Sequence, residues 1–354
     1  RPKTLSRRML GEVHEIPVGS AVVFGGGAFG TAAALVLAKK GAKVAVWDLG
    51  KEQADAVNST KENKAFLPGF TIPDNITWHH EVAPSVEGVE IMLVAIPSQF
   101  LRGFLKANAE ILPKGVPFVL CAKGIEVSTM MTPYEIVKDV LPEEFMKDVA
   151  VLSGPSFAKE VAQGQPTNVV VASFNDELTK KVQGQMSCFK SNFRTYSSDD
   201  VMGCEIAGAV KNVLAVASGC STGLGFGNNT RAALICRGLS EMSRLAKAMG
   251  SNARAMPGLA GAGDLLLTCS SDLSRNFSVG KRLAEGESPE SVLSSKGPVA
   301  EGVATAKSIH SLAAKLGVDM PICEMVFQVI YEGKAVTEAL KELQSRPMGV
   351  DVAF

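Results

Sequence analysis

A chain of 354 residues is long enough for two domains that each bury a core of their own. Hydrophobic residues make up 46% of the chain and charged residues 20%, which is typical of a folded globular protein and not of a disordered one. The 36 basic and 36 acidic residues cancel, so we expect neither nucleic acid nor a membrane surface as a partner.

The seven cysteines are scattered and include no C-x-x-C pair. This usage predicts a reducing compartment and argues against a disulfide framework or a zinc site, so no metal is expected. A soluble protein of the cytoplasm or of an organelle stroma, plastid included, fits it. The longest uncharged stretch, residues 212–230, is too rich in Gly, Ser and Asn to cross a membrane. The chain begins with Arg1 and not Met, so we expect residues 1–17 to be a tail or a linker, with a domain fused upstream left open.

The first predicted element is a short β-branched run, residues 21–24, that breaks into glycines and continues as a helix. Gly25, Gly27 and Gly30 fit the pattern G-x-G-x-x-G, which supplies a tight turn, room for a pyrophosphate and close packing of helix on strand. Free N–H groups from about Ala28 onward would point at the phosphate. The stretch therefore predicts a dinucleotide site, with a plain structural turn as the alternative.

A second strand at residues 43–47 ends in Asp48. The spacing from the glycines suits a carboxylate that accepts hydrogen bonds from an adenosine ribose. An acid at this place repels a 2′-phosphate, so the charge favours NAD(H) over NADP(H).

Further buried strands alternate with helices up to about residue 199. We predict strands at 90–96, 117–121, 149–152, 168–172 and 193–196, and helices at 51–63, 99–106 and 176–188. Ser98 is expected to cap the helix at 99–106. This order predicts an α/β fold, with a mostly parallel, doubly wound Rossmann-type sheet over residues 18–199.

From Val201 onward the spacing of apolar residues is helical and convincing strands disappear. The predicted helices are 201–218, 230–249, 279–284, 299–316, 322–331 and 337–344. We therefore expect an all-helical domain over residues 200–346 and a tail at 347–354. Its Ala, Leu and Met residues suit either a core or a homodimer interface.

Lysine, and not histidine, is the expected proton donor. The four histidines, His14, His79, His80 and His310, stand in no motif. Lys211 interrupts a helix of small apolar residues, and burial there lowers a lysine pKa toward neutrality. Lys123 follows a strand at the ligand-binding end of the sheet. For both lysines the alternative is a solvated or snorkelling side chain.

A second polar group lies between glycines and a leucine run. Asp264 either caps the helix that starts there or holds a lysine ammonium. Arg275 and Asn276 supply a planar cation and an amide that suit phosphate, and Thr268 adds a hydroxyl. The nearby Cys121 and Cys269 are expected to be buried apolar filler.

These stretches together resemble one family. They are Phe29-Gly30-Thr31-Ala32, Ile96-Pro97-Ser98-Gln99-Phe100, Lys123-Gly124, Gly154-Pro155-Ser156-Phe157-Ala158, Ala209-Val210-Lys211-Asn212, Gly263-Asp264-Leu265, Ser274-Arg275-Asn276 and Val299-Ala300-Glu301-Gly302. In this order, over about residues 21–339, the chain resembles the NAD-dependent glycerol-3-phosphate dehydrogenases, in particular their bacterial and organellar branch. Bacterial members often carry a basic residue near the position of Asp48, and this departure strengthens the expectation of NAD.

The resemblance implies a role for each matching residue. Lys211 would be the general acid, Asp264 would orient it, and Lys123 would stabilise the developing alkoxide. The phosphate-holding positions are Asn212, Thr268, Arg275 and Asn276. The cofactor positions are Phe29, Phe100, Ala158, Arg275 and Glu301, beside the glycines and Asp48; core packing is the alternative for the two phenylalanines, and residues 294–298 would form a lid.

The expected reaction is the reversible reduction of dihydroxyacetone phosphate by NADH to sn-glycerol 3-phosphate, in a cleft between the two domains. One alternative is a β-hydroxyacid or 6-phosphogluconate-type dehydrogenase, which grips a carboxylate and has no need of Arg275 and Asn276. Another is an NADH sensor without catalysis, which has no need of Lys123, Lys211 and Asp264.

Overall fold

The computed structural model describes residues 14–294 and 300–347. Most of the predicted tails at 1–17 and 347–354, and of the predicted lid at 294–298, lies outside the described residues. The predicted boundary between residues 199 and 200 falls between the last strand and the first long helix.

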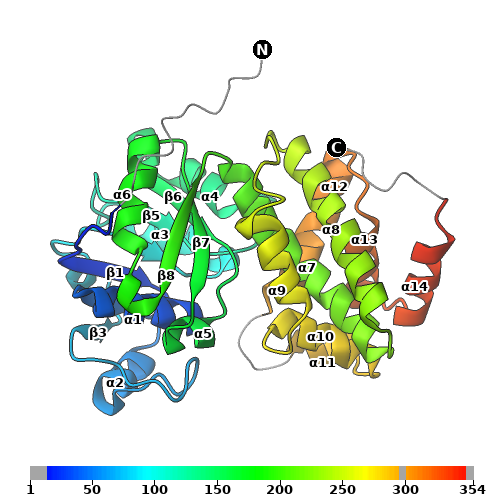
Figure 1. Ribbon diagram of the computed structural model, residues 1–354, viewed down its shortest axis with the longest axis horizontal. Helices are drawn as coiled ribbons and strands as arrows, with labels where there is room; N and C mark the ends of the chain where they lie inside the picture. The colour runs from blue at the N-terminus through cyan, green and yellow to red at the C-terminus, as the bar shows by residue number, and fades with distance from the viewer. Residues whose placement is uncertain (1–13, 295–299, 348–354) are drawn as a thin grey trace.

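The first part of the chain forms a single eight-stranded sheet in the order β3-β2-β1-β4-β5-β6-β7-β8 (Figure 1). The strands are β1 (Ser20–Phe24), β2 (Lys43–Trp47), β3 (Ile76–His79), β4 (Met92–Val94), β5 (Phe118–Leu120), β6 (Val149–Ser153), β7 (Thr167–Ala172) and β8 (Phe193–Ser198). Neighbouring strands pair in parallel except β6 and β7, which pair antiparallel. The predicted doubly wound, mostly parallel sheet is confirmed.

Helices cover both faces of the sheet because alternate strand residues point to opposite sides. Val23, Leu93 and Val119 pack on one face against α1 (Ala28–Lys40), α2 (Lys51–Thr60), α5 (Ala158–Gln163) and α6 (Asp176–Met186). Val22 and Val94 pack on the other face with α3 (Ser98–Asn108) and α4 (Pro133–Val140). Short 3-10 turns η2 (Ala83–Ser85), η3 (Glu143–Asp148) and η4 (Phe189–Ser191) complete this half, which we call the sheet half.

After β8 the described residues form helices and no strand. They are α7 (Val201–Gly223), α8 (Asn228–Ala248), the π-helical turn η5 (Leu259–Gly263), α9 (Asp264–Cys269), α10 (Arg275–Ala284), α11 (Pro289–Ser294), α12 (Glu301–Leu316), α13 (Pro321–Tyr331) and α14 (Val336–Ser345). Figure 1 shows this helical half beside the sheet half, with α9 on the side that faces the strands. The sequence predicted six of these helices and a helix start at Asp264, but neither α11 nor the π turn.

Helix α7 is the centre of the helical half. By length and composition it is the one described helix that is apolar enough to span a membrane, yet 89% of its most apolar window is buried inside the protein. Its apolar character therefore serves the core.

Helices α7 and α10 touch backbone to backbone. A Cβ on Gly219 would lie 2.0 Å from the carbonyl oxygen of Phe277, and one on Gly280 would lie 1.9 Å from that of Val216. Any side chain at either glycine would force the helices apart. This close crossing fixes where the first turn of α10, with Arg275 and Asn276, lies relative to α7.

A buried acid joins α7 to the sheet half. The carboxylate of Glu205 accepts a 2.9 Å hydrogen bond from the backbone N–H of Tyr134 in the first turn of α4. Burial raises the pKa of Glu205 to about 8, although the bonds from Tyr134 and Thr132 act in the opposite direction. The carboxyl is therefore held close to its neutral form at physiological pH.

Glu205→Gln is expected to stabilise the protein at alkaline pH. The Glu205 carboxyl holds its proton more tightly in the folded state than in the unfolded chain, where its pKa has the ordinary value of 4.5. The resulting stability is present below pH 4.5 and is lost as the pH rises through about 8. Thermal melts should show the variant a few degrees above the wild type at about pH 9 and level with it at about pH 5. The exposed Glu144→Gln is the control, and a pH-independent effect of Glu205→Gln would contradict the prediction.

Candidate functional site

Two glycines of the glycine-rich turn between β1 and α1 lie so close to backbone atoms that a side chain would not fit at either. Gly25 has a φ of +109°, and a Cβ on it would lie 2.8 Å from the carbonyl oxygen of Ala95. A Cβ on Gly30 would lie 1.9 Å from the carbonyl oxygen of Gly25. Gly27 begins α1 without a side-chain cap, and a Cβ built there meets no atom within 4 Å. The helix N-terminus at Ala28 therefore opens on free space, which fits a bound pyrophosphate.

Asp48 leaves β2 and turns back on the glycines. Its Oδ1 accepts a 3.0 Å hydrogen bond from the backbone N–H of Gly50, while its Oδ2 would lie 2.5 Å from a Cβ on Gly26. The buried Asn63 donates to the carbonyl of Gly26 and to the hydroxyl of Thr31, each at 2.8 Å. Asn63 has no sequence signal, because no local pattern marks an amide in the loop after α2 as a partner of a turn 37 residues away.

The two predicted aromatic cofactor residues differ in their surroundings. Phe29 is partly buried against the core of the sheet half. Phe100 on α3 is 61% exposed, so core packing does not explain it. Ala158 is the first residue of α5, the helix that packs beside α1. Phe29, Phe100 and Ala158 thus lie in the first turns of α1, α3 and α5, and their contact with a cofactor stays a prediction.

A contact between Glu301 and Ser98 crosses from one half to the other. The hydroxyl of Ser98 lies 3.4 Å from Oε2 of Glu301, 203 residues further along the chain. Burial raises the pKa of Glu301 to about 7, and the charge of the exposed Arg275 partly offsets this effect. The expectation that Ser98 caps α3 is wrong: Pro97 occupies the cap position, and the Ser98 hydroxyl is directed to Glu301.

One buried carboxylate stands between two lysines, and we call Lys123, Asp264 and Lys211 the Lys–Asp–Lys cluster. Nζ of Lys123 lies 2.6 Å from Oδ2 of Asp264, and Nζ of Lys211 lies 2.6 Å from Oδ1. The Asp264 side chain is 1% exposed, that of Lys211 8% and that of Lys123 22%. Lys123 comes from the sheet half and the other two residues from the helical half, so the cluster spans both.

Backbone and hydroxyl groups fix the two ammonium groups. Nζ of Lys211 donates to the hydroxyl of Thr268 at 2.9 Å, and that hydroxyl donates to the backbone carbonyl of Asp264 at 2.6 Å. Nζ of Lys123 also lies 3.3 Å from the carbonyl oxygen of Gly154, a contact that the sequence did not predict. Thr268 therefore orients Lys211 in this structure. That Thr268 also contacts the substrate phosphate stays a prediction.

The cluster shifts the proton affinities of its members. Burial lowers the pKa of Lys211 to about 8, against the raising effect of the Asp264 charge, and Lys123 lowers it further. Burial alone would raise the pKa of Asp264, but the two lysine charges outweigh it and hold this pKa below its ordinary value. Asp264 is thus ionised, and Lys211 can give or take a proton near neutral pH.

Of the two roles predicted for Asp264, capping is wrong. Gly263 takes the cap position of α9, and the Asp264 carboxylate faces the lysines and not the helix N–H groups. The alternative of a solvated Lys211 is excluded by its burial. Cys121 and Cys269 are buried free thiols, as expected of apolar filler.

Two amides beside the cluster bond each other. Nδ2 of Asn276 donates to Oδ1 of Asn212 at 2.9 Å, and Oδ1 of Asn276 accepts from the backbone N–H of Gly302 at 2.9 Å. This chain connects α7 and α10 to the first turn of α12. The structure therefore brings Asn212, Asn276 and Glu301 to one region, and Arg275 stands at the same helix start as Asn276.

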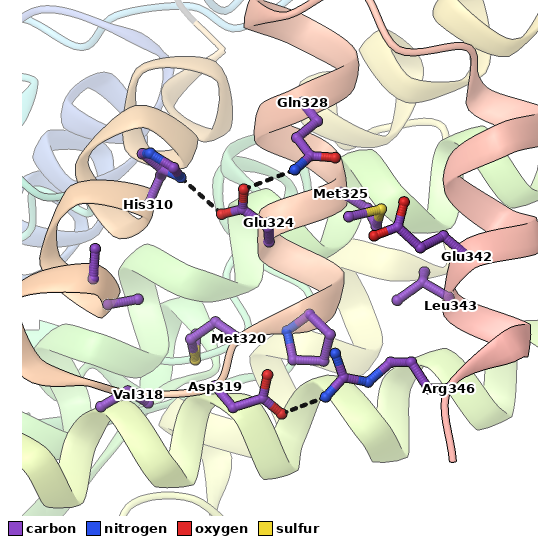
Figure 2. A pocket seen from close by; sticks show the side chains of 13 residues that line it. His310, Val318, Asp319, Met320, Glu324, Met325, Gln328, Glu342, Leu343 and Arg346 are labelled. Carbon is purple, nitrogen blue, oxygen red and sulfur yellow. Dashed lines mark hydrogen bonds and ion pairs between the residues drawn. The ribbon is translucent and has the colours of Figure 1, made fainter. Parts of the chain in front are cut away.

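A pocket of about 400 Å³ lies elsewhere, between α12, α13 and α14 (Figure 2). Its charged side chains are already paired, His310 with Glu324 at 2.7 Å and Arg346 with Asp319 at 2.7 Å. None of the predicted site residues lines it. We therefore do not assign the chemistry to this pocket.

Comparison with known proteins identifies the family. Family models for the NAD-dependent glycerol-3-phosphate dehydrogenase N-terminus and C-terminus match residues 20–179 and 200–341. The glycosomal glycerol-3-phosphate dehydrogenase [NAD(+)] of Trypanosoma brucei brucei is 48% identical over 328 residues, 91% of this chain and 92% of the relative. Glycerol-3-phosphate dehydrogenase [NAD(P)+] of Anaeromyxobacter dehalogenans (strain 2CP-C) is 48% identical over 326 residues, 92% of this chain and 98% of the relative.

A solved structure agrees over the same span. The crystal structure of glycerol-3-phosphate dehydrogenase from Coxiella burnetii superposes with a TM-score of 0.87 at 35% identity, covering 93% of this chain and 99% of that one. D-mandelate dehydrogenase, at a TM-score of 0.56 and 14% identity, shares the fold alone. With two matching family models and relatives of this identity over nine-tenths of its length, the chain belongs to the family of NAD-dependent glycerol-3-phosphate dehydrogenases.

Proposed function

We propose that this protein catalyses the reversible reduction of dihydroxyacetone phosphate by NADH to sn-glycerol 3-phosphate. The Lys–Asp–Lys cluster carries the proposal, because it presents a lysine with a pKa of about 8 beside a second cation. A carbonyl oxygen that becomes an alkoxide needs such a proton donor and such positive charge. The names of the relatives, which specify glycerol-3-phosphate dehydrogenase, supply the substrate.

Each member of the cluster has one task in the proposed reaction. The residues of the glycine-rich turn would hold NADH, which would supply the hydride for the carbonyl carbon. Lys211 gives a proton from Nζ to the carbonyl oxygen, so an O–H bond forms as an N–H bond breaks, and water later restores the proton. Lys123 stabilises the negative charge on that oxygen, and Asp264 holds both ammonium groups in place. In the oxidation of the alcohol, neutral Lys211 takes the proton back.

The remaining predicted residues suit the other parts of the two ligands. Arg275, with its planar cation, and the amides of Asn212 and Asn276 would hold the substrate phosphate. The glycine-rich turn and the start of α1 would hold the pyrophosphate of the cofactor. Asp48 would accept hydrogen bonds from the adenosine ribose and repel a 2′-phosphate, which makes NAD(H) the preferred cofactor.

The test is the loss of NADH absorbance with dihydroxyacetone phosphate, using the purified full chain. We expect rapid turnover with NADH, slower turnover with NADPH, and far slower turnover with dihydroxyacetone, which lacks the phosphate. Exposed Lys315→Met serves as a control that should match the wild type. A folded protein that binds NADH but reduces none of these carbonyls would contradict the proposal.

A further inference from the structure

The indole nitrogen of Trp78 is a buried donor without a hydrogen-bond partner among the described residues. Trp78 lies in β3 and is 3% exposed. Its backbone N–H and carbonyl are both held by the Asn58 side chain at 2.9 Å, so the strand is fixed at this residue. An unpaired buried N–H is costly, and a native protein keeps few of them without a reason.

The unpaired nitrogen lies beside the cofactor turn. A Cβ placed on Gly26 would be 2.8 Å from Nε1 of Trp78 and 2.5 Å from Oδ2 of Asp48. The indole N–H and the carboxylate oxygen therefore share the same small space against the turn. The orientation of the carboxylate is set from the other side, because Oδ1 of Asp48 accepts from the Gly50 N–H at 3.0 Å.

The cofactor itself does not supply the partner of this donor. Nε1 has less than 1 Å² of accessible area, so a ligand in the cofactor site cannot reach it. Oδ2 of Asp48 is an acceptor at the same place against Gly26, and a hydrogen bond between the two atoms requires the carboxylate to rotate toward the indole. A hydrogen bond from an N–H group to an ionised carboxylate is stronger than one between neutral groups and favours the charged form.

We propose that Trp78 is a positioning residue for the cofactor, acting through Asp48. When a dinucleotide lies on the glycine-rich turn, the indole N–H donates to Oδ2 of Asp48 and keeps the carboxylate directed at the ribose. Trp78 thereby contributes to the preference for NAD(H) over NADP(H). This inference rests on the cofactor preference given under Proposed function.

The other tryptophan of the chain is a matched control. Trp47 is the last residue of β2, next to Asp48, but its indole nitrogen already donates to the carbonyl of His80 at 3.1 Å. Trp47→Phe also removes an indole N–H close to Asp48, but it leaves the proposed bond between Trp78 and Asp48 in place. Trp78→Phe keeps an aromatic ring in the core and removes only the donor side of the indole.

Binding measurements separate positioning from packing. We expect Trp78→Phe to raise the Kd for NADH about tenfold, as one hydrogen bond to a charged group predicts, with the Kd for NADPH unchanged or lower. Trp47→Phe should change neither by more than about twofold. In an Asp48→Asn background the effect of Trp78→Phe on NADH should shrink to about twofold or less. Equal losses for both cofactors, or the same loss with and without Asp48, would overturn the proposal.

The indole signal itself gives a second measurement that does not depend on catalysis. In Trp47→Phe protein labelled with ¹⁵N-tryptophan, Trp78 gives the single indole N–H resonance. NADH should move this resonance downfield and slow its exchange with water, and an unmoved resonance at saturating NADH would refute the bond. Wild-type protein that binds NADH without reducing dihydroxyacetone phosphate would contradict the proposed reaction only, because this resonance decides the role of Trp78 separately.

Discussion

Lys211→Met is expected to lower kcat for the reduction of dihydroxyacetone phosphate by about a thousandfold, within the range that general acid catalysis contributes. Methionine has a similar length and is apolar, so it fits the buried site, and the Kd for NADH should stay close to that of the wild type. In the wild type the pKa of Lys211, lowered to about 8 by burial, should appear in the pH profile. Reduction needs the protonated lysine, so its rate should be full below pH 8 and fall above it.

The reverse reaction should show the opposite pH dependence. Oxidation of sn-glycerol 3-phosphate needs neutral Lys211, so its rate should rise as the pH passes through about 8. Steady-state rates in both directions, measured across this range, check the assignment. A variant that keeps a tenth or more of the wild-type kcat, or profiles that bend in the same direction for both reactions, would contradict the role of Lys211.

Asp264→Asn is expected to lower kcat by about a hundredfold and to move the pH profile. The carboxylate raises the pKa of Lys211 against burial, so its removal should shift the upper limit of reduction to a pH below 8. Two mostly buried ammonium groups would also lose their shared counterion, which should lower the free energy of unfolding by about 3 kcal/mol.

The measurements are the pH dependence of kcat and denaturant unfolding at fixed pH. Asp319→Asn is a matched control, since its carboxylate pairs with Arg346 on the surface and should affect neither. Asp264→Glu restores the charge and should recover part of the activity. A wild-type pH profile in Asp264→Asn would show that the carboxylate does not set the pKa of Lys211.

The sheet and the glycine-rich turn could be predicted because their signals are local. The apolar strands, the glycine spacing and the acid after β2 each arise within a few residues, and the structure confirms their order. The π turn before α9 was missed because residues 258–263 contain three glycines, which disfavour helices in isolation. Packing against the sheet half and α7 overrides that preference.

Long-range pairings could not be read from the sequence. Asp264 contacts Lys123 across 141 positions, and local pattern left capping and charge pairing as equal roles for it. Ser98 has the sequence context of a helix cap, yet its hydroxyl donates a hydrogen bond to the carboxylate of Glu301. The unpaired nitrogen of Trp78 has no sequence signal, because only the folded chain brings β3 and Asp48 to the same side of Gly26.

The shared carboxylate also limits how this protein can be recombined. Lys123 belongs to the sheet half and Asp264 to the helical half, so the sheet half taken alone would carry a lysine whose counterion lies in the missing part, while the helical half would keep the Lys211–Asp264 pair without its second cation. A chimaera that exchanges one half with that of a distant homologue must therefore retain a cation at position 123 together with the acid at 264. The two halves differ in architecture, but one cluster of charges contains residues of both and therefore needs both.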